Sequence, residues 1–154
     1  MRAEAYAAYL QTAGAGYAED NVTSGRWPRE GALERSLAEH EALLPLGVAT
    51  PGHHLFEILN AEGGPAVGYL WFAVQEGHGV RSAFIYDVEI KPEFRRQGHA
   101  RRAFQALEEF IAALNLSSIC LHVFANNPSA QALYRELGFA ATGINMRKQV
   151  GGKK

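Results

Sequence analysis

The stretch VEIKPEFRRQGHARRAF, residues 88–104, decides the fold of this chain, because it joins a strand-like segment to a helical one through a short basic loop. Gly98 stands at the start of the helical pattern, where the lack of a side chain lets a ligand approach the main chain. The amino terminus of a helix exposes unpaired N–H groups and the positive end of the helix dipole. We therefore expect a small anion, such as a phosphate, to bind at this loop.

Four arginines around the glycine can supply charge-assisted contacts to a diphosphate or a ribose phosphate: Arg95, Arg96, Arg101 and Arg102. The alternative is a solvated helix start, in which the arginines only keep the surface soluble. The patterns GxxxxGK followed by Ser or Thr, and GxGxxG, are both absent, so the usual nucleotide-binding loops are not supported. The formal net charge of −1 also argues against a general nucleic-acid binder.

After the loop, the sequence alternates between helix and strand patterns. Apolar residues recur at helical spacing over residues 100–114, which predicts an amphipathic helix packed on a sheet. Residues 118–124 predict a strand, and residues 139–150 predict the last one. Between these strands a second helix is expected, and three residues mark its ends: Asn127 as amino cap, Pro128 in the first position and Gly138 at the left-handed carboxyl end.

Before the loop, the sequence predicts two helices and then three strands. The helices are expected at residues 2–21 and 30–44. Turn residues at 61–66 and 76–79 separate the strand-like segments, which indicates an antiparallel meander. The predicted strands are residues 55–59, 67–74 and 81–90.

The composition is that of an ordinary globular domain, since 47% of the 154 residues are hydrophobic and 20% are charged. We expect one domain over residues 1–150 and a loose tail at residues 151–154. The order of helix and strand patterns indicates an α+β (α/β) fold with helices on both faces of a central sheet.

Cys120 is the one cysteine of the sequence, so an intramolecular disulfide and a cysteine-rich metal site are both excluded. This cysteine usage fits a reducing cytosol. No stretch approaches the roughly 18 consecutive apolar residues of a membrane span. We therefore expect a soluble cytoplasmic protein with no membrane partner and no nucleic-acid partner.

From residue 86 to residue 139 the chain resembles the GCN5-related N-acetyltransferase (GNAT) family, which transfers an acyl group from coenzyme A to an amine. The pyrophosphate loop of that family has Gln or Arg, two residues, Gly, one residue, and Gly or Ala, and Arg95, Gly98 and Ala100 match it. Beyond its motifs the chain resembles an uncharacterised bacterial branch of the family. LHVFANNPSAQALYRELGF resembles the second family signature, with the expected order Val123, Asn127, Ala130, Leu133, Tyr134, Gly138 and Phe139.

The resemblance implies a mixed, mostly antiparallel sheet in which the strand ending at Ile90 and the strand ending near Phe124 are splayed apart. The slot between them would hold the pantetheine arm of acetyl-CoA, the expected cosubstrate, and no metal is expected. Two departures from the family pattern are Arg96, where many members have glycine, and the lack of a strand before the first helix. The residues expected to bind the cosubstrate are Val88, Glu89, Ile90, Arg95, Arg96, Gln97, Gly98, His99, Ala100, Arg101, Asn127 and Tyr134.

Amine acylation needs a base for the attacking ammonium and an acid for the departing thiolate. By resemblance Tyr134 is the expected acid; otherwise it is a core tyrosine at helical spacing. Two residues are candidates for the base, His122, whose ordinary pKa of about 6.5 suits the role, and Glu89, acting directly or through a water. Otherwise His122 bonds a backbone carbonyl and Glu89 lies on a solvated strand face.

The expected function is acetyl-CoA-dependent N-acetylation of a small-molecule or peptide amine by direct attack. Cys120 is not favoured as a covalent nucleophile, because the sequence shows no acidifying partner. One rival is a non-catalytic acyl-CoA-binding sensor or interaction module. Another is a small nucleic-acid binder using KPEFRR, which the overall charge disfavours.

The acceptor side is poorly defined by the sequence. Four residues are candidates to shape an amine pocket, and otherwise they are core aromatics and loop histidines: Trp27, His53, His54 and Trp71. The adjacent histidines lack a further ligand cluster, so a metal site is disfavoured. A homodimer is possible, because dimers are common in the resembling family and an open sheet edge needs cover.

Overall fold

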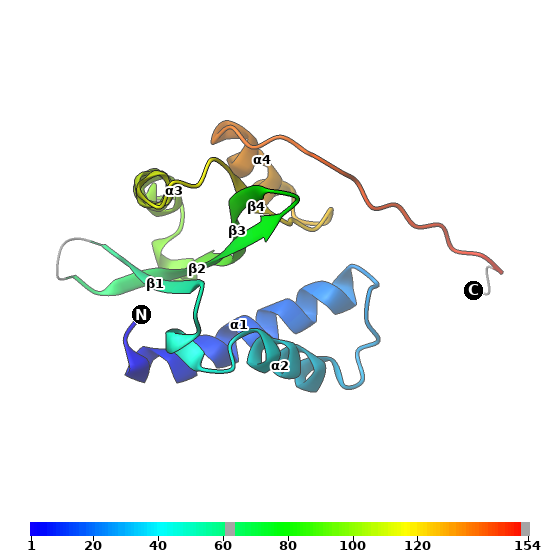
Figure 1. Ribbon diagram of the computed structural model, residues 1–154. Helices are drawn as coiled ribbons and strands as arrows, with labels where there is room; N and C mark the ends of the chain where they lie inside the picture. The colour runs from blue at the N-terminus through cyan, green and yellow to red at the C-terminus, as the bar shows by residue number, and fades with distance from the viewer. Residues whose placement is uncertain (61–63, 152–154) are drawn as a thin grey trace.

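The computed structural model describes residues 1–60 and 64–151. Its helices are α1 (Ala3–Thr23), α2 (Ala32–Leu43), α3 (His99–Ala113) and α4 (Pro128–Glu136), and its strands are β1 (His53–Leu59), β2 (Ala66–Gly77), β3 (Val80–Ile90) and β4 (Ile119–Leu121). The α1–α2 pair lies on one face of the sheet, and α3 and α4 lie on the other (Figure 1). The expected α+β fold with helices on both faces is confirmed.

The sheet has the order β1-β2-β3-β4, and its first three strands form the predicted antiparallel meander. At the β2–β3 turn, His78 and Gly79 have φ angles of 53° and 80°, which suit a two-residue hairpin. β4 pairs with β3 in parallel, from Ala83 opposite Ile119 to Ile85 opposite Leu121. Of the turn predicted at residues 61–66, residues 61–63 lie outside the described part of the chain.

An apolar cluster fills each side of the sheet. The alternation of β2 sends Leu70 and Phe72 toward α3 and Trp71 toward α1. Phe104, on α3, is 1% exposed within the first cluster, which confirms the amphipathic pattern of that helix. The second cluster packs Tyr9 of α1 against Trp71 together with Leu44 and Leu55.

The ends of α4 follow the sequence prediction. Oδ1 of Asn127 accepts a hydrogen bond from the backbone N–H of Ala130 at 3.2 Å, Pro128 is the first helical residue, and Gly138 has a φ of 99°. These contacts confirm the capping role of Asn127. None of the helices in the described residues has the length and apolar character needed to cross a membrane.

The prediction of a last strand at residues 139–150 is wrong for this structure. Phe139 packs against Phe104 and Tyr134, and the chain then runs extended and away from the sheet (Figure 1). A strand requires a neighbouring backbone, and residues 140–151, here named the terminal arm, make no backbone–backbone hydrogen bond with the rest of the described chain.

Candidate active site

The predicted anion-binding loop joins β3 to α3 through a 3-10 turn at Pro92–Phe94. Gly98 directly precedes α3 with a φ of 82°, and a Cβ placed on it would lie 2.8 Å from Nη1 of Arg102. Arg96 also has a left-handed φ, 64°, which explains why glycine suits this position in many members of the resembling family. The path of the loop therefore depends on the backbone at these two positions.

The loop carries a row of main-chain donors. No backbone N–H of residues 96–101 has a hydrogen-bond partner within the described chain, and the first bond of α3 joins the N–H of Arg102 to the carbonyl of Gly98 at 3.1 Å. Unpaired N–H groups that precede and open a helix form a site suited to a phosphate. The geometry thus agrees with an anion site made by the main chain.

Three of the four loop arginines make hydrogen bonds or ion pairs within the protein. Nε of Arg95 donates to the carbonyl of Ile90 at 2.7 Å, Arg101 pairs with Glu136 at 2.7 Å, and Arg102 donates to the carbonyl of Gln97 at 3.0 Å. The fourth, Arg96, is exposed. Direct arginine contacts to a diphosphate stay a prediction.

The expected slot lies where β3 continues beyond β4. Pairing between the two strands ends at Ile85 and Leu121, while β3 extends to Ile90. The N–H of Lys91 points to β2, where it bonds Val67, so by alternation the main-chain groups of Val88 and Ile90 face the open edge. These are the groups expected to pair with a pantetheine arm.

A β-bulge shapes the opposite face of β3. Trp71 pairs with Asp87 and the next residue of β2, Phe72, pairs with Ile85, so Tyr86 is an extra residue in β3. Tyr86 stacks on Trp71, with ring centroids 4.7 Å apart, and Asp87 bonds Tyr9 of α1. The bulge therefore turns two successive side chains toward the α1–α2 layer.

Asp87 is the most perturbed carboxyl group near the open end of β3. Its Oδ2 accepts a hydrogen bond from the Tyr9 hydroxyl at 2.7 Å. Burial raises the pKa of Asp87 to about 6, with further increases from Glu89 and Asp20, while the Tyr9 hydroxyl and the backbone N–H of Val88 oppose the shift. Asp87 can therefore exchange a proton near neutral pH.

Tyr134 lies on α4, partly buried between aromatic rings. Its ring centroid is 5.9 Å from that of Phe104 and 5.7 Å from that of Phe139. Burial raises the pKa of Tyr134, and the negative charge of Asp87 adds to the shift. The charge of Asp87 therefore affects the phenol of Tyr134.

The two base candidates from the sequence lie in other surroundings. His122 directly follows β4, is largely exposed and stands edge-on to Phe124 at 4.8 Å. Partial burial and the Arg26 cation lower the pKa of His122. Glu89 lies near Arg95, whose Nη2 is 3.9 Å from its Oε2, a weak ion pair.

The neighbouring histidines of β1 point to opposite faces of the sheet. Nδ1 of His53 accepts a hydrogen bond from Nε1 of Trp71 at 3.0 Å, and its ring stacks on Tyr86. His54 stacks on Phe72, with ring centroids 4.7 Å apart. They cannot bind one ion together, and the described residues contain no His, Cys, Asp or Glu group suited to a metal.

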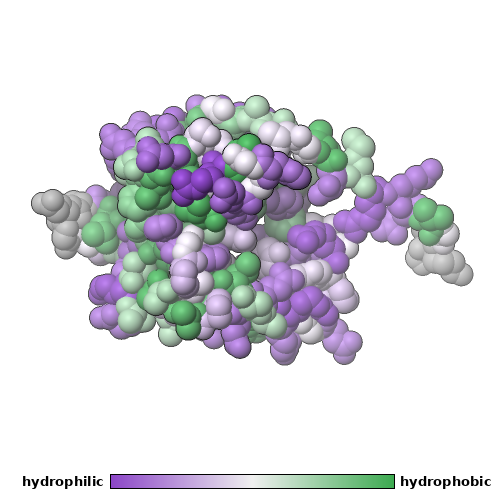
Figure 2. All heavy atoms as spheres, viewed as in Figure 1, coloured by the Kyte–Doolittle hydropathy of each residue, from purple (hydrophilic) through white to green (hydrophobic). Residues whose placement is uncertain are grey.

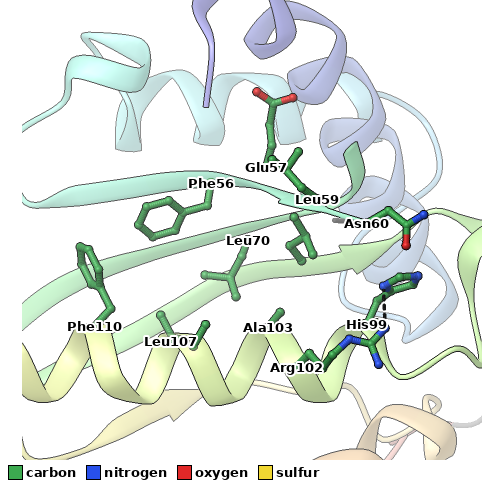
Figure 3. Close-up of a pocket in the computed structure, with 12 residues that line it drawn as sticks. Phe56, Glu57, Leu59, Asn60, Leu70, His99, Arg102, Ala103, Leu107 and Phe110 are labelled. Carbon is green, nitrogen blue, oxygen red and sulfur yellow. Dashed lines mark hydrogen bonds between the residues drawn. The ribbon is translucent and has the colours of Figure 1, made fainter. Parts of the chain in front are cut away.

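A cavity of about 480 Å³ lies behind the loop, between α3 and strands β1 and β2 (Figure 3). Phe56, Leu107 and Phe110 form part of its apolar wall. At one end Arg102 donates to Nδ1 of His99 at 3.1 Å, and the buried Nε2 of His99 has no partner in the described chain. This cavity contains none of the candidate catalytic residues, so it is not the expected cosubstrate slot.

The sequence offers Tyr86 and Asp87 only as residues that either face the acceptor pocket or decorate the sheet, and it does not predict the contact of Asp87 with Tyr9. Their contact joins residues 78 positions apart, and it depends on a bulge that one strand's own sequence does not mark. An acidic residue after two aromatic ones in an apolar strand was the available signal.

Comparisons with known proteins agree with this geometry. A model described as "Acetyltransferase (GNAT) family" matches residues 19–139. Two uncharacterized N-acetyltransferases of Bacillus subtilis (strain 168) are similar over almost the whole chain: YdgE is 35% identical over 150 residues, 97% of this chain and 95% of YdgE, and YycN is 36% identical over 151 residues, 97% and 96%. The crystal structure of YycN has a TM-score of 0.91 at 35% identity and covers 97% of this chain and 95% of that chain.

Proposed function

Because the chain belongs to the acetyltransferase (GNAT) family, we propose that it transfers the acetyl group of acetyl-CoA to a primary amine by direct attack. The observation that carries the proposal is the row of unpaired N–H groups at residues 96–101, next to the open edge of β3. Together they offer one site for a diphosphate and one for an amide-containing arm. A ligand that has both groups, as acetyl-CoA does, is therefore bound at two places on the same surface.

In this proposal the main chain holds the cosubstrate. The N–H groups of residues 96–101 bind the diphosphate, and Val88 and Ile90 pair with the pantetheine amides. Asn127, whose side chain caps α4, also bonds the arm. The thioester then supplies the electrophilic carbonyl, and the acceptor nitrogen forms an amide as the C–S bond breaks.

Tyr134 is the proposed acid that protonates the departing thiolate. Its partly buried phenol has a raised pKa, so it keeps its proton at neutral pH and can donate it. The neighbouring rings of Phe104 and Phe139 fix its position.

Asp87 is the base that the structure favours, ahead of His122 and Glu89. Its pKa of about 6 leaves most of it ionised at neutral pH, so it can attract an ammonium group and accept its proton. The charge of Asp87 also raises the pKa of Tyr134, whereas His122 contacts Phe124. His122 and Glu89 stay alternatives that the same experiments test.

The proposed acceptor is a small cationic amine. Tyr86, Trp71 and Tyr9 surround Asp87 with aromatic rings, and aromatic faces attract cations. Two relatives that match part of the chain are named for such substrates, a thialysine N-epsilon-acetyltransferase of Bos taurus, 33% identical over 97 residues, and a spermidine N(1)-acetyltransferase of Vibrio cholerae, 41% identical over 59 residues. We place the reaction in the cytoplasm, in a homodimer.

The test is an amine screen with acetyl-CoA that measures the released thiol. The panel contains thialysine, lysine, spermidine and an aminoglycoside, and acetylated products are identified by mass spectrometry. We expect amine-dependent thiol release with at least one member. If CoA binds but no amine in the panel is acetylated, the chain is an acyl-CoA sensor and the proposal fails.

A further inference from the structure

The loop between α1 and α2 carries a cation that reaches the end of β4. Figure 2 shows mainly hydrophilic residues over the end of α1 and the loop that follows it. In this loop the guanidinium carbon of Arg26 lies 5.9 Å from the centroid of the Phe124 ring. No carboxylate in the described part of the chain forms an ion pair with Arg26. An arginine on an aromatic face without an acid keeps its N–H donors available to a ligand.

Both helices hold this loop in place. The backbone N–H groups of Arg26 and Trp27 donate to the carbonyl of Asn21 at 2.9 Å and 3.1 Å, and Asn21, in α1, is 0% exposed. From α2, the guanidinium of Arg35 lies over the Trp27 ring at 5.3 Å. The backbone from which the Arg26 side chain projects is therefore fixed relative to α1 and α2.

Arg26 and Asp87 border the open slot on its two strands. Pairing between β3 and β4 ends at Ile85 and Leu121. Asp87 lies two residues beyond that pair on β3, and Phe124, which Arg26 contacts, lies three residues beyond it after β4. The side chain of Asp87 bonds α1, and Arg26 belongs to the loop that follows α1, so both lie on the α1–α2 side of the sheet.

The two borders of the slot carry charges of opposite sign. On the β4 border, partial burial and the Arg26 cation lower the pKa of His122. On the β3 border, burial and the negative charges of Glu89 and Asp20 raise the pKa of Asp87. A molecule that carries only ammonium groups pairs with the acidic border alone, whereas one that also carries a carboxylate pairs with both.

We propose that Arg26 binds a carboxylate of the acceptor, so that the substrates are small amino acids with a side-chain amine rather than simple polyamines. This inference rests on the proposed function, because it places the reacting amine at Asp87. The planar guanidinium offers two parallel N–H donors to a carboxylate. A diamine of the same length leaves these donors unpaired, so Arg26 determines specificity.

The test compares lysine with cadaverine and ornithine with putrescine, because the members of each pair differ only in the carboxylate. Calorimetric titration in the presence of CoA measures their binding without turnover. Each amino acid should bind at least ~10-fold more tightly than its diamine, since hydrogen bonds between charged groups supply that factor or more. In Arg26→Gln the amino acids should bind only as tightly as the diamines, whose affinity should change little.

Arg29→Gln is the matched control. Arg29 lies in the same loop but pairs with Glu19 at 3.1 Å, so this variant should keep the wild-type preference for the amino acids. If Arg26 only packs on Phe124, its substitution should weaken both members of a pair alike, and the preference should persist. That result, equal affinities within both pairs of the wild-type chain, an equal loss of preference in Arg29→Gln, or no binding of any of the four amines would each overturn the proposal.

Thiol release from acetyl-CoA with the same four amines separates this inference from the proposed function. If the amino acids bind preferentially but no thiol is released, carboxylate recognition stands and acetyl transfer fails. If all four amines are acetylated with equal kcat/KM within each pair, acetyl transfer stands and carboxylate recognition fails.

Discussion

The candidate site has two parts, a donor side proposed to hold acetyl-CoA and an acceptor side proposed to hold the amine. The two parts are built in different ways. The donor side uses main-chain groups from one continuous region, residues 88–101, with α4 beside it. The acceptor side uses the side chains of Tyr9, Trp71, Tyr86 and Asp87, which come from two consecutive strands and from α1, far away in the sequence. The donor side should therefore tolerate side-chain changes but not backbone changes, and the acceptor side should behave in the opposite way.

Asp87→Asn should have the largest effect, a loss on the order of 10³-fold in kcat, because the amide neither accepts the proton nor attracts an ammonium group. In the wild-type enzyme kcat/KM should rise with pH through about 6, as Asp87 ionises. A pH profile with a fixed amine measures both quantities. His122→Ala is the comparison variant. If only this substitution removes the rise of kcat/KM with pH, the base is His122 and not Asp87.

The same substitution should change the pH dependence of stability. Asp87 has a pKa of about 6 in the folded chain against an ordinary value of 3.8, so between these values the folded state holds a proton that the unfolded state has lost. Stability should therefore fall as pH rises through this window, by up to about 3 kcal/mol. Urea unfolding at pH 4 and pH 7 measures the fall, and Asp87→Asn should reduce it. If Asp87→Asn leaves the pH dependence of the unfolding free energy unchanged, the pKa of Asp87 is not raised in the folded chain.

Tyr134→Phe should lower kcat on the order of 10²-fold and leave the affinity for CoA nearly unchanged, because only the hydroxyl is lost. Steady-state kinetics and calorimetric titration with CoA separate the two quantities. Tyr17→Phe is a matched control, since Tyr17 lies on α1 rather than α4 and packs edge-on to Trp27. Unchanged turnover in Tyr134→Phe would leave Tyr134 as a packing residue.

Gly98→Val should weaken CoA binding by at least about 10-fold, because a β-branched residue strains a left-handed backbone by roughly 1–2 kcal/mol and displaces the loop. Gly79→Val controls for strain alone: its φ is 80° against 82°, but it lies in the β2–β3 turn. Calorimetric titration should separate the two variants, while thermal unfolding should find them similar. Equal CoA affinities would mean that the loop does not bind the diphosphate.

The sequence predicts the backbone of the β3–α3 loop and the caps of α4 well, because their determinants are local. Gly98 and the caps of α4 act on main-chain groups only a few residues away, so spacing alone reveals them. The same holds for the meander, whose turns and alternation lie within residues 53–90.

The arrangement of the acceptor side and the path of the terminal arm escape prediction, because both depend on contacts between distant parts of the chain. The side chain of Asp87 faces α1 through a bulge, and a bulge reflects the register between two strands rather than either sequence. The pattern of residues 139–150 is typical of a strand, but a pattern does not contain the neighbouring backbone that a strand needs. The ion pairs of the loop arginines escape prediction for the same reason, since Arg101 pairs with Glu136, 35 residues away.

Asn127 caps α4 and is also proposed to contact the cosubstrate. Its substitution should have the smallest effect of those considered, but it separates these two roles. Asn127→Ala removes the cap of α4 and should cost about 1 kcal/mol of unfolding free energy. Asn127→Asp keeps an acceptor for the N–H of Ala130 but adds a negative charge where an anionic cosubstrate is proposed. If Asn127 also contacts the cosubstrate, the Asp variant should keep its stability and lose CoA affinity, as chemical denaturation and calorimetry would show. If CoA affinity only follows stability in both variants, Asn127 serves the helix alone, and the donor side consists of the loop and the edge of β3.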